Sequence, residues 1–229
     1  MVDNEDRISS FNTMEIATSS RRKRYYEVVK RGIDIVGSMI GLFFFIITYI
    51  ILFIPYHFGE NKGSVLFKQQ RLGKNGEIFE IFKFRSMKTN ADDILKNDQY
   101  LYKKYVSNGY KLEVQEDPRI TKLGCFIRKY SIDELPQFLN VLIGEMSLVG
   151  PRPIVLDELE EYKKENEVKA FLSMKPGLTG VWQVSGRSSV GYPERVYLET
   201  SYLNKQSLSF DLKVLFLTAV KVLKKDGAY

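Results

Sequence analysis

The sequence predicts an α+β protein in which an N-terminal membrane helix precedes a compact, mostly helical domain with a small β-hairpin. Three observations predict this class. A long apolar window without formal charge lies near the N-terminus, two short apolar runs flank a glycine-containing turn, and several later segments have helical patterns. With hydrophobic residues at 44% and charged residues at 27% of its 229 residues, the chain can bury a substantial core.

Residues 1–24 are predicted to form a flexible basic N-terminal arm. Positions 1–20 are polar and lack apolar periodicity, and the basic run 21–24 follows them. No apolar run falls within the first twenty positions, so the segment does not have the pattern of a secretory signal.

Residues 25–60 are predicted to insert into a membrane as a helical hairpin. The uncharged window 35–59 would reach roughly 37 Å as a helix, which is enough for the hydrocarbon layer. A buried core helix is the alternative, but a stretch of this length that is apolar on every face is rare in a soluble domain. Basic residues flank the window on both sides, which a single span cannot satisfy, whereas a hairpin that enters and leaves by the same face can.

The position of the bend is less clearly marked. A hairpin needs Gly, Pro or a polar side chain where its backbone hydrogen bonds are broken. None of the candidates lies in the middle of the window, so the sequence leaves re-entry and a span both open; the candidates are Gly37, Ser38, Gly41, Thr48 and Pro55.

Residues 61–229 are predicted to form one domain that begins with the β-hairpin. Two strands, over 65–67 and 78–84, are joined by a turn at 73–76. The segment 117–124 has the pattern of a turn. The later expectations are a helix and a loop over 91–116, helices over 133–143, 157–174 and 210–223, with Ser209 capping the last, and a glycine-rich loop over 175–187.

Two residue counts restrict the chemistry. The single cysteine, Cys125, excludes an internal disulfide and a Cys-rich zinc site. The single histidine, His57, lies at the edge of the apolar window, and any centre that needs a histidine would have to use it. If the protein is catalytic, its chemistry is therefore expected to rest on carboxylates, Lys, Arg and Tyr, with a hard cation such as Mg²⁺. The net charge of +6 suits an anionic partner: nucleic acid, acidic lipid or a phosphorylated small molecule.

The adjacent acids Asp133 and Glu134 are the first candidate site. Ser131 and Glu134 have the spacing of a helix capping box, so a purely structural role is the alternative. In the functional interpretation, a carboxylate at a helix N-terminus is kept ionised by the helix dipole, as a nucleophile or Mg²⁺ ligand must be. The two acids can then divide the work, one attacking while the other helps to hold the metal.

Several basic residues are candidates for phosphate binding. Arg152 lies between Pro151 and Pro153, which favour an extended backbone and a rigid grip on phosphate oxygens. An ordinary turn with a solvated charge is the alternative. Lys83 and Arg85 come at the end of a strand near the membrane, where either would meet a lipid phosphate or simply extend to the interface. Arg128 adds positive charge near the acidic pair.

The glycine-rich loop over 175–187 allows a ligand to approach the backbone closely. Trp182, Gln183 and Arg187 offer stacking and phosphate contacts. The spacing fits neither a Walker loop nor a dinucleotide fingerprint, so the loop alone is a weak signal.

Together these motifs resemble one family, the bacterial sugar transferases. These are the monotopic phosphoglycosyl transferases that start polysaccharide assembly on a polyprenyl phosphate. The resemblance covers the chain from Tyr25 to the C-terminus and consists of several motifs in the same order: Lys30-Arg31 with Asp34, then 70–73, 83–87, 117–121, 133–137, 140–142, 146–153 and 175–187.

The resemblance implies a mechanism. Asp133 would be the nucleophile, and Glu134 its neighbour, with both beside Mg²⁺ as ligands. Attack of Asp133 on the β-phosphate of a UDP-sugar would release UMP, and undecaprenyl phosphate would then take the sugar phosphate from the covalent adduct. Phosphate oxygens would be held by Lys83, Arg128 and Arg152, and the nucleotide sugar would lie near Gly180, Gln183, Gly186 and Arg187.

The resemblance also implies a location and a pathway. The protein would sit at the bacterial inner (cytoplasmic) membrane with its catalytic domain facing the cytoplasm, and would initiate exopolysaccharide, capsule, O-antigen or glycoprotein glycan assembly. Its partners would be membrane lipid, a second copy in a homodimer, and downstream glycosyltransferases. Family members usually break the membrane helix with a proline near its middle, where this chain has Ile46-Ile47. The additional transmembrane block of larger relatives is lacking, which predicts a minimal catalytic unit.

Two other classes of function compete with this hypothesis. A non-catalytic membrane adaptor would keep the fold, but the intact acidic pair and Arg152 argue against it. A nucleic-acid binder would use the basic run 21–24, which serves equally well as a lipid anchor beside an apolar segment, so we expect no nucleic-acid partner. The sequence leaves the sugar open among galactose, glucose and N-acetylated or deoxyamino sugars.

Overall fold

The computed structural model describes residues 4–108, 112–114, 116–186 and 189–224, with side chains described from residue 23 onward. The α-helices are α1 (Asn4–Phe53), α2 (Ala91–Asn97), α3 (Gln99–Ser107), α4 (Lys122–Lys129), α5 (Gln137–Ile143), α6 (Glu165–Leu172), α7 (Val181–Ser185), α8 (Glu194–Lys205) and α9 (Leu208–Lys224). The strands are β1 (Leu66–Leu72), β2 (Ile78–Phe84), β3 (Ser147–Val149) and β4 (Gly177–Thr179). Short 3₁₀ helices cover Pro55–His57, Gly59–Asn61, Lys74–Gly76, Ile132–Glu134 and Leu156–Glu161.

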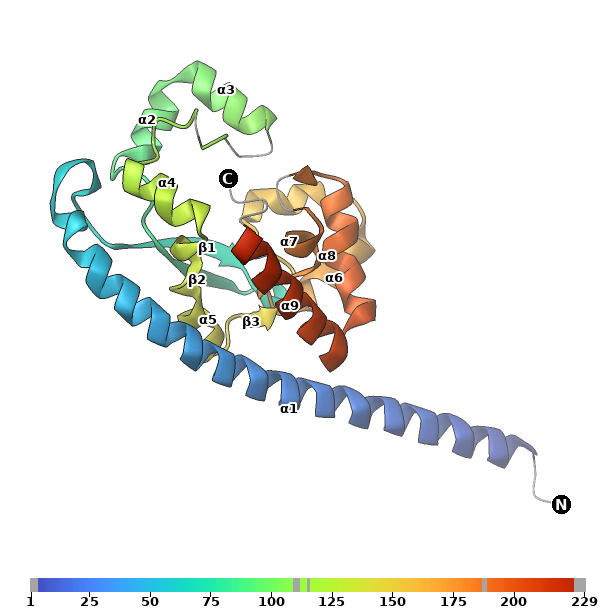
Figure 1. Cartoon of the computed structure of the whole chain (residues 1–229). Coiled ribbons are helices and arrows are strands. Elements are labelled where there is room, and N and C mark those ends of the chain that lie inside the picture. The colour runs from blue at the N-terminus through green and yellow to red at the C-terminus, as the bar shows by residue number, and fades with distance from the viewer. Residues whose placement is uncertain (1–3, 109–111, 115, 187–188, 225–229) are drawn as a thin grey trace.

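Helix α1 is long and unbroken, and it runs along one side of the domain (Figure 1). It differs from the sequence expectation at both ends. Residues 4–24 are helical where a flexible arm is predicted, and the predicted hairpin over 25–60 is a single helix as far as Phe53. The chain reverses only afterwards, through the 3₁₀ turns that follow Ile54. The reversal occurs next to Pro55, one of the bend candidates.

The two sides of α1 have different surroundings. The part of α1 from Lys23 to Phe53 is long and apolar enough to span a membrane. Among the described residues, it is the one helix that meets both criteria. Only 17% of its most apolar window is buried, which is unlike a core helix of a soluble protein. At helical spacing, one side of α1 exposes the apolar side chains of Val36, Met39, Ile40, Phe43, Phe44, Ile46, Ile47, Ile50 and Ile51.

The side of α1 that faces the domain packs closely on it. A Cβ at Gly41 would lie 2.2 Å from the ring of Phe138 on α5, so only glycine allows this approach. Further along, Leu52 and Tyr56 are buried with Phe84 and Ile127 in a second apolar cluster. The domain therefore contacts α1 near both ends of its apolar segment.

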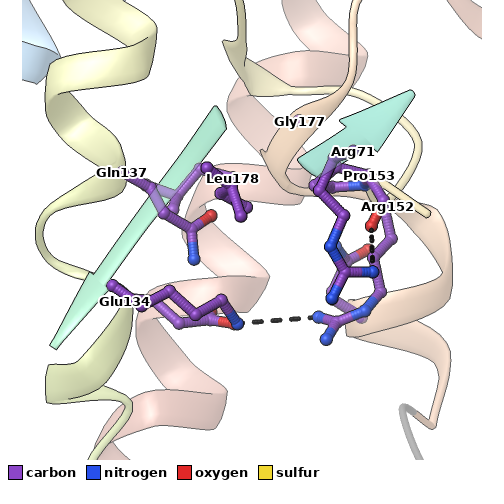
Figure 2. Close-up of a pocket in the computed structure, with 10 residues that line it drawn as sticks. Arg71, Glu134, Gln137, Arg152, Pro153, Gly177 and Leu178 are labelled. Carbon is purple, nitrogen blue, oxygen red and sulfur yellow. Dashed lines mark hydrogen bonds and ion pairs between the residues drawn. The ribbon is translucent and has the colours of Figure 1, made fainter. Parts of the chain in front are cut away.

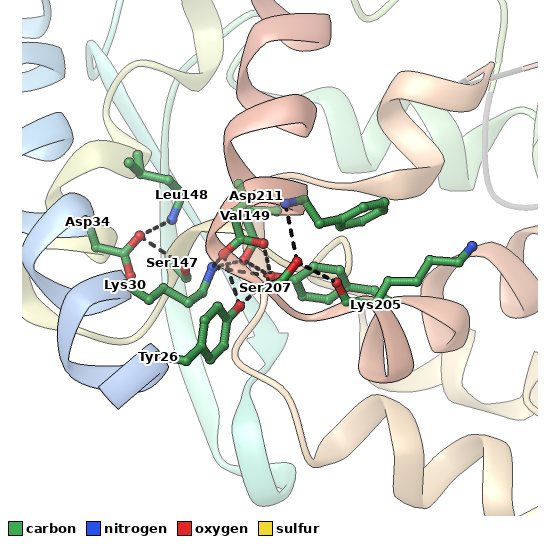
Figure 3. Close-up of polar contacts among 11 residues, drawn as sticks. Tyr26, Lys30, Asp34, Ser147, Leu148, Val149, Lys205, Ser207 and Asp211 are labelled. Atoms are coloured by element: carbon green, nitrogen blue, oxygen red, sulfur yellow. Dashed lines mark hydrogen bonds and ion pairs between the residues drawn. The ribbon is translucent and has the colours of Figure 1, made fainter. Parts of the chain in front are cut away.

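Polar contacts also fix α1 to the domain at the start of this segment (Figure 3). We call the residues Tyr26, Lys30, Tyr202 and Asp211 the α1–α9 cluster. Lys30 Nζ donates to Asp211 Oδ2 at 2.7 Å, to the Val149 carbonyl at 2.9 Å and to Tyr202 Oη at 3.2 Å. Tyr26 Oη and Tyr202 Oη also donate to Asp211, at 2.9 and 2.6 Å.

Two neighbours of Lys30 add to the same attachment. Asp34 is 4% exposed and accepts from the Leu148 amide at 2.8 Å and from Ser147 Oγ at 3.0 Å. Arg31 donates to two carbonyls at the end of α5, each at 2.7 Å, and so caps that helix. The basic pair 30–31 thus contacts the domain rather than lipid.

The predicted β-hairpin is confirmed. Strands β1 and β2 pair antiparallel from Leu66 opposite Phe84 to Leu72 opposite Ile78. The turn needs left-handed backbone, with φ of 61° at Asn75 and 81° at Gly76, which Asn and Gly adopt readily. Phe79 and Ile81 of β2 enter the main core, which also contains Val141, Met146 and Val149.

Other segments differ from their predictions because tertiary contacts, which the sequence does not display, divide them. The segment 91–116 contains two helices, α2 and α3, and the predicted helix 157–174 is a 3₁₀ helix followed by α6. The segment 175–187 includes β4, which pairs in parallel with β3, and α7 rather than only a loop. Helices α4 and α8 were not predicted. At the start of α9, Ser207 and not Ser209 accepts from the Phe210 amide, at 3.3 Å.

Candidate active site

The acidic pair lies in a 3₁₀ turn before α5, not in the first turn of an α-helix. Ser131 has a left-handed backbone with φ of 55° and makes no capping hydrogen bond through its side chain. The α-helix begins only at Gln137, after Pro136. The capping-box alternative is therefore wrong, and helix capping does not account for the presence of Asp133 and Glu134.

Asp133 is held in surroundings that disfavour its charge. Burial raises its pKa from the ordinary 3.8 to about 6; Lys83 opposes this rise and the neighbouring Glu134 adds to it. Arg128 and Arg152 also lower it. The α-helix begins only at Gln137, so the expected dipole at Asp133 is not found, and burial raises the pKa of Asp133 instead. A carboxylate with a pKa near 6 is still mostly ionised at neutral pH.

Glu134 faces two of the predicted phosphate-binding residues (Figure 2). Its Oε1 lies 3.4 Å from Lys83 Nζ and 3.7 Å from an Arg152 nitrogen. These are loose ion pairs, longer than a well-formed charged hydrogen bond. Burial lowers the pKa of Lys83, and Glu134 offsets part of that shift. One carboxylate thus lies beside both cationic side chains, and the pair of cations can also bind a second anion.

Arg152 is oriented by its backbone and by an aromatic ring. Its amide donates to Glu199 Oε2 at 2.9 Å, and its guanidinium lies 5.5 Å from the centre of the Trp182 ring. Trp182 is itself fixed, since its Nε1 donates to the Val190 carbonyl at 2.8 Å. Arg128, whose charge also acts on Asp133, donates from its Nε to Ser86 Oγ at 2.7 Å.

A group of residues that the sequence analysis did not single out supports this arrangement. Glu158 accepts from Arg195 at 3.0 Å and from Tyr192 Oη at 2.9 Å, and lies 3.4 Å from Arg71. Burial alone would raise the pKa of Glu158, but Arg195 and Arg71 bring it below its ordinary value. Arg195 also stacks on Trp182, at 4.5 Å. These contacts join segments far apart in the sequence, so no local motif marks them.

The predicted nucleotide-sugar residues separate into three groups. Gln183 lines the pocket. Gly180 and Gly186 are not among its lining residues: a Cβ at Gly180 would lie 2.0 Å from the Gly150 carbonyl, so this glycine permits the close crossing of two backbones. Arg187 falls outside the described residues. Gly177, which the sequence analysis did not assign, lines the pocket in their place.

Side chains around Glu134 line a small pocket with a cavity volume of about 10 Å³ (Figure 2). Asp133 is not among its lining residues, but it interacts with the charges of Lys83 and Arg152 inside it. A pocket with three basic side chains beside a carboxylate suits an anionic ligand such as a phosphate group. Its lining residues are Arg71, Ile81, Lys83, Glu134, Gln137, Arg152, Pro153, Gly177, Leu178 and Gln183.

The acidic pair can bind a magnesium ion only if a bound substrate supplies further oxygen ligands. Among the described residues there is no group of three or more His, Cys, Asp or Glu side chains that would hold a metal alone. Asp133 and Glu134 offer carboxylate oxygens, and Mg²⁺ in phosphate sites is commonly bound by one or two carboxylates together with phosphate oxygens and water. The donor set thus fits an ion that arrives with a phosphorylated substrate.

A pocket lined by basic side chains and a long helix with an exposed apolar side together indicate a membrane-associated protein with a site suited to an anion. The chain belongs to the bacterial sugar transferase family, whose sequence pattern matches residues 25–225. This confirms the resemblance drawn from the motifs.

Curated relatives carry the names of sugar transferases. The chain is 44% identical to the galactosyl transferase CpsE of Streptococcus agalactiae over 98% of its own length and 49% of that protein. It is 44% identical to the undecaprenyl-phosphate galactose phosphotransferase of Salmonella typhimurium, covering 90% of this chain and 43% of that one. The exopolysaccharide production protein ExoY of Rhizobium meliloti is 38% identical, with 88% of each chain covered. The chain thus spans half or less of the first two relatives.

Proposed function

We propose that this protein transfers a sugar-1-phosphate from a UDP-sugar to undecaprenyl phosphate and releases UMP. The observation that carries the proposal is the Asp133–Glu134 pair: Glu134 lies beside Lys83 and Arg152 in the pocket, and the buried Asp133 interacts with the charges of both. Membership of the bacterial sugar transferase family and the names of the relatives support the choice of substrates.

The first half of the reaction forms a covalent adduct. A carboxylate oxygen of Asp133 attacks the β-phosphorus of the UDP-sugar, and the bond from that phosphorus to the oxygen bridging the two phosphates breaks. UMP leaves with that oxygen, and the sugar phosphate stays on Asp133 as an acyl phosphate. In the second half, a phosphate oxygen of undecaprenyl phosphate attacks the same phosphorus and Asp133 leaves. Neither half needs a proton transfer, so the reaction needs no histidine.

The side chains of the pocket provide positioning and charge. Lys83 and Arg152 bind the phosphoryl oxygens of the substrate, and both side chains keep the positions beside Glu134 that they have in the structure. Arg128, whose charge acts on Asp133, attracts the diphosphate toward the nucleophile. Asp133 and Glu134 would hold Mg²⁺ together with the substrate, and the ion would neutralise charge on the phosphates. Gln183, which lines the pocket, would contact the nucleotide sugar.

We also propose that α1 lies in the cytoplasmic leaflet of the inner membrane without crossing it. The domain contacts α1 at Lys30 and Asp34 before the apolar segment and at Leu52 and Tyr56 after it. Two ends that touch one compact domain lie on the same side of the bilayer. The exposed apolar side of α1 then faces the acyl chains, as in an interfacial helix. This places the pocket where a cytosolic nucleotide sugar meets a lipid phosphate.

A UMP-release screen tests the proposal. The protein in detergent or nanodiscs is incubated with Mg²⁺, undecaprenyl phosphate and each of a panel of UDP-sugars, beginning with UDP-galactose and UDP-glucose. We expect UMP release with at least one sugar, dependence on Mg²⁺, and no release by the Asp133→Asn variant. Full turnover by that variant contradicts the role of Asp133, and failure with every UDP-sugar favours the non-catalytic adaptor instead.

The product would be a polyprenyl-diphosphate sugar that the next enzymes extend. By the names of the relatives, exopolysaccharide assembly is the pathway we propose, with downstream glycosyltransferases as partners.

A further inference from the structure

Two amide side chains in the pocket lack the hydrogen bonds that their burial demands. Gln137 is 3% exposed and Gln183 is 6% exposed. Within the described part of the chain, Nε2 of Gln137 and both amide atoms of Gln183 are buried without a hydrogen-bond partner. A buried polar group without a partner costs free energy, and native proteins rarely tolerate one without a reason. Both side chains line the pocket, where a bound ligand can supply the missing partner.

Another amide on the same helix shows that the fold can satisfy such a group. Asn140, one turn further along α5, is completely buried, and its Nδ2 donates to the Glu80 carbonyl at 2.7 Å and to Glu145 at 2.8 Å. Its Oδ1 accepts from the Phe82 amide at 3.0 Å. Asn140 joins α5 to β2 and is structural. Gln137 has no comparable task, since its Nε2 bonds to none of the described residues.

Gln137 lies close to the reacting groups. It follows Glu134 by three residues and Asp133 by four, and it lines the pocket together with Glu134 and Lys83. In Figure 2 its amide points into the space beside Glu134. The basic side chains there already share carboxylates, since Lys83 and Arg152 face Glu134 and Arg71 faces Glu158. The Gln137 amide can bond a ligand without breaking an ion pair.

We propose that Gln137 Nε2 donates a hydrogen bond to a non-bridging oxygen of the phosphoryl group that is transferred. This inference rests on the proposed function and adds a substrate contact to it. An N–H₂ group is a donor only, and the phosphoryl oxygens that Lys83 and Arg152 are proposed to bind are the acceptors expected in this pocket. The phosphoryl group stays at this position through both halves of the reaction, so Gln137 contacts it throughout.

The variant Gln137→Met tests this contact, because Met has a similar length and no donor. The matched control is Gln99→Met, at an exposed position on α3. Each full-length protein is assayed for UMP release, and its thermal unfolding is followed alone, with UDP and with UMP. UDP carries the β-phosphate that Gln137 is proposed to contact, and UMP lacks it.

For Gln137→Met we expect an unchanged or higher Tm without ligand, because an unpaired buried amide is removed. We expect kcat/KM for UMP release to fall 10- to 100-fold and the stabilisation by UDP to shrink, while stabilisation by UMP stays as in the wild type. Gln99→Met should match the wild type throughout.

Three results would overturn the inference. A lower Tm with activity lost only in proportion to the folded fraction would make Gln137 structural. Unchanged UMP release and unchanged UDP stabilisation would show that it contacts no ligand. Normal UDP stabilisation with weakened UDP-sugar binding would place the contact on the sugar. If the wild type releases no UMP from any UDP-sugar, the proposed function fails, but the comparison of UDP with UMP still decides the contact.

Discussion

Two polar clusters in this protein are built from similar side chains but differ in how completely those side chains are paired. In the α1–α9 cluster, Lys30 makes three hydrogen bonds of 2.7 to 3.2 Å, and Asp211 accepts from three donors (Figure 3). In the pocket, Glu134 lies 3.4 and 3.7 Å from its cations, and two buried amides lack partners among the described residues (Figure 2).

The difference separates structural polar groups from functional ones. A fully paired buried cluster repays its desolvation within the folded chain and holds one element against another. A pocket with loose ion pairs, unpaired amides and a carboxylate with a raised pKa is less stable than it could be, and a ligand can supply what is missing. Substitutions in the first cluster should therefore reduce stability, and substitutions in the second should reduce activity and leave stability unchanged or higher.

The largest effect is expected for Asp133→Asn. Loss of the nucleophile should lower the rate of UMP release by at least about 10⁴-fold. Because burial raises the pKa of Asp133, its charge destabilises the folded state, so the neutral Asn should raise the unfolding free energy by roughly 1 kcal/mol at pH 8. Single-turnover assays measure the rate, and denaturant unfolding at pH 8 measures the unfolding free energy. A variant that is both inactive and unstable would contradict the contrast between the clusters.

Lys30→Met should show the opposite pattern. Removing the ammonium leaves Asp211 buried, with a side chain only 7% exposed and without its charged partner. We expect a loss of about 3 kcal/mol in unfolding free energy, with turnover per folded molecule changed less than about threefold. Denaturant unfolding in detergent, with activity corrected for the folded fraction, distinguishes this from a catalytic role.

Arg152→Lys tests whether the pocket needs a planar guanidinium. Lys keeps the charge and the amide that bonds Glu199, but it loses stacking on Trp182 and the ability to bind two phosphoryl oxygens at once. The expected result is a drop in kcat/KM of about 30-fold with no loss of Tm. Equal activity of the two residues would show that only the charge at this position matters.

The pH dependence of UMP release gives a smaller, graded effect. Asp133 attacks only when ionised, and its pKa is raised to about 6, so the ionised fraction falls as the pH drops below that value. We expect kcat/KM to be level above pH 7 and to fall about tenfold per unit well below pH 6. A profile level down to pH 4.5 would mean that the nucleophile keeps an ordinary pKa.

The smallest effect is expected at an exposed ion pair. Lys68 and Glu80 face each other across the hairpin at 2.8 Å, but both side chains are more than half exposed, at 55% and 53%. Lys68→Met should change the unfolding free energy by less than about 0.5 kcal/mol, because water screens the pair. This variant is the matched control for Lys30→Met. An equal loss of unfolding free energy at both positions would remove the distinction between buried and exposed ion pairs.

The sequence predicted those features whose cause is local. The hairpin follows from apolar runs and a turn at 73–76 in which Asn75 and Gly76 take left-handed backbone, and the apolar helix follows from composition alone. The acidic pair and Arg152 were found through motifs. Glu158, Arg195 and Glu199 support the site through contacts between distant segments, which no local pattern reveals. Lys30 and Arg31 have the pattern of charges that set membrane topology, but only the packing shows that they bind the domain.

The central claim is that Asp133 becomes covalently bound to the sugar phosphate, and mass spectrometry tests it most directly. The protein is incubated with Mg²⁺ and an active UDP-sugar in the absence of undecaprenyl phosphate, then measured intact and after digestion. We predict a gain of one sugar phosphate on the peptide that contains Asp133, lost when undecaprenyl phosphate is added. The same gain on another side chain, or full UMP release into lipid product without any gain on Asp133, would contradict the account.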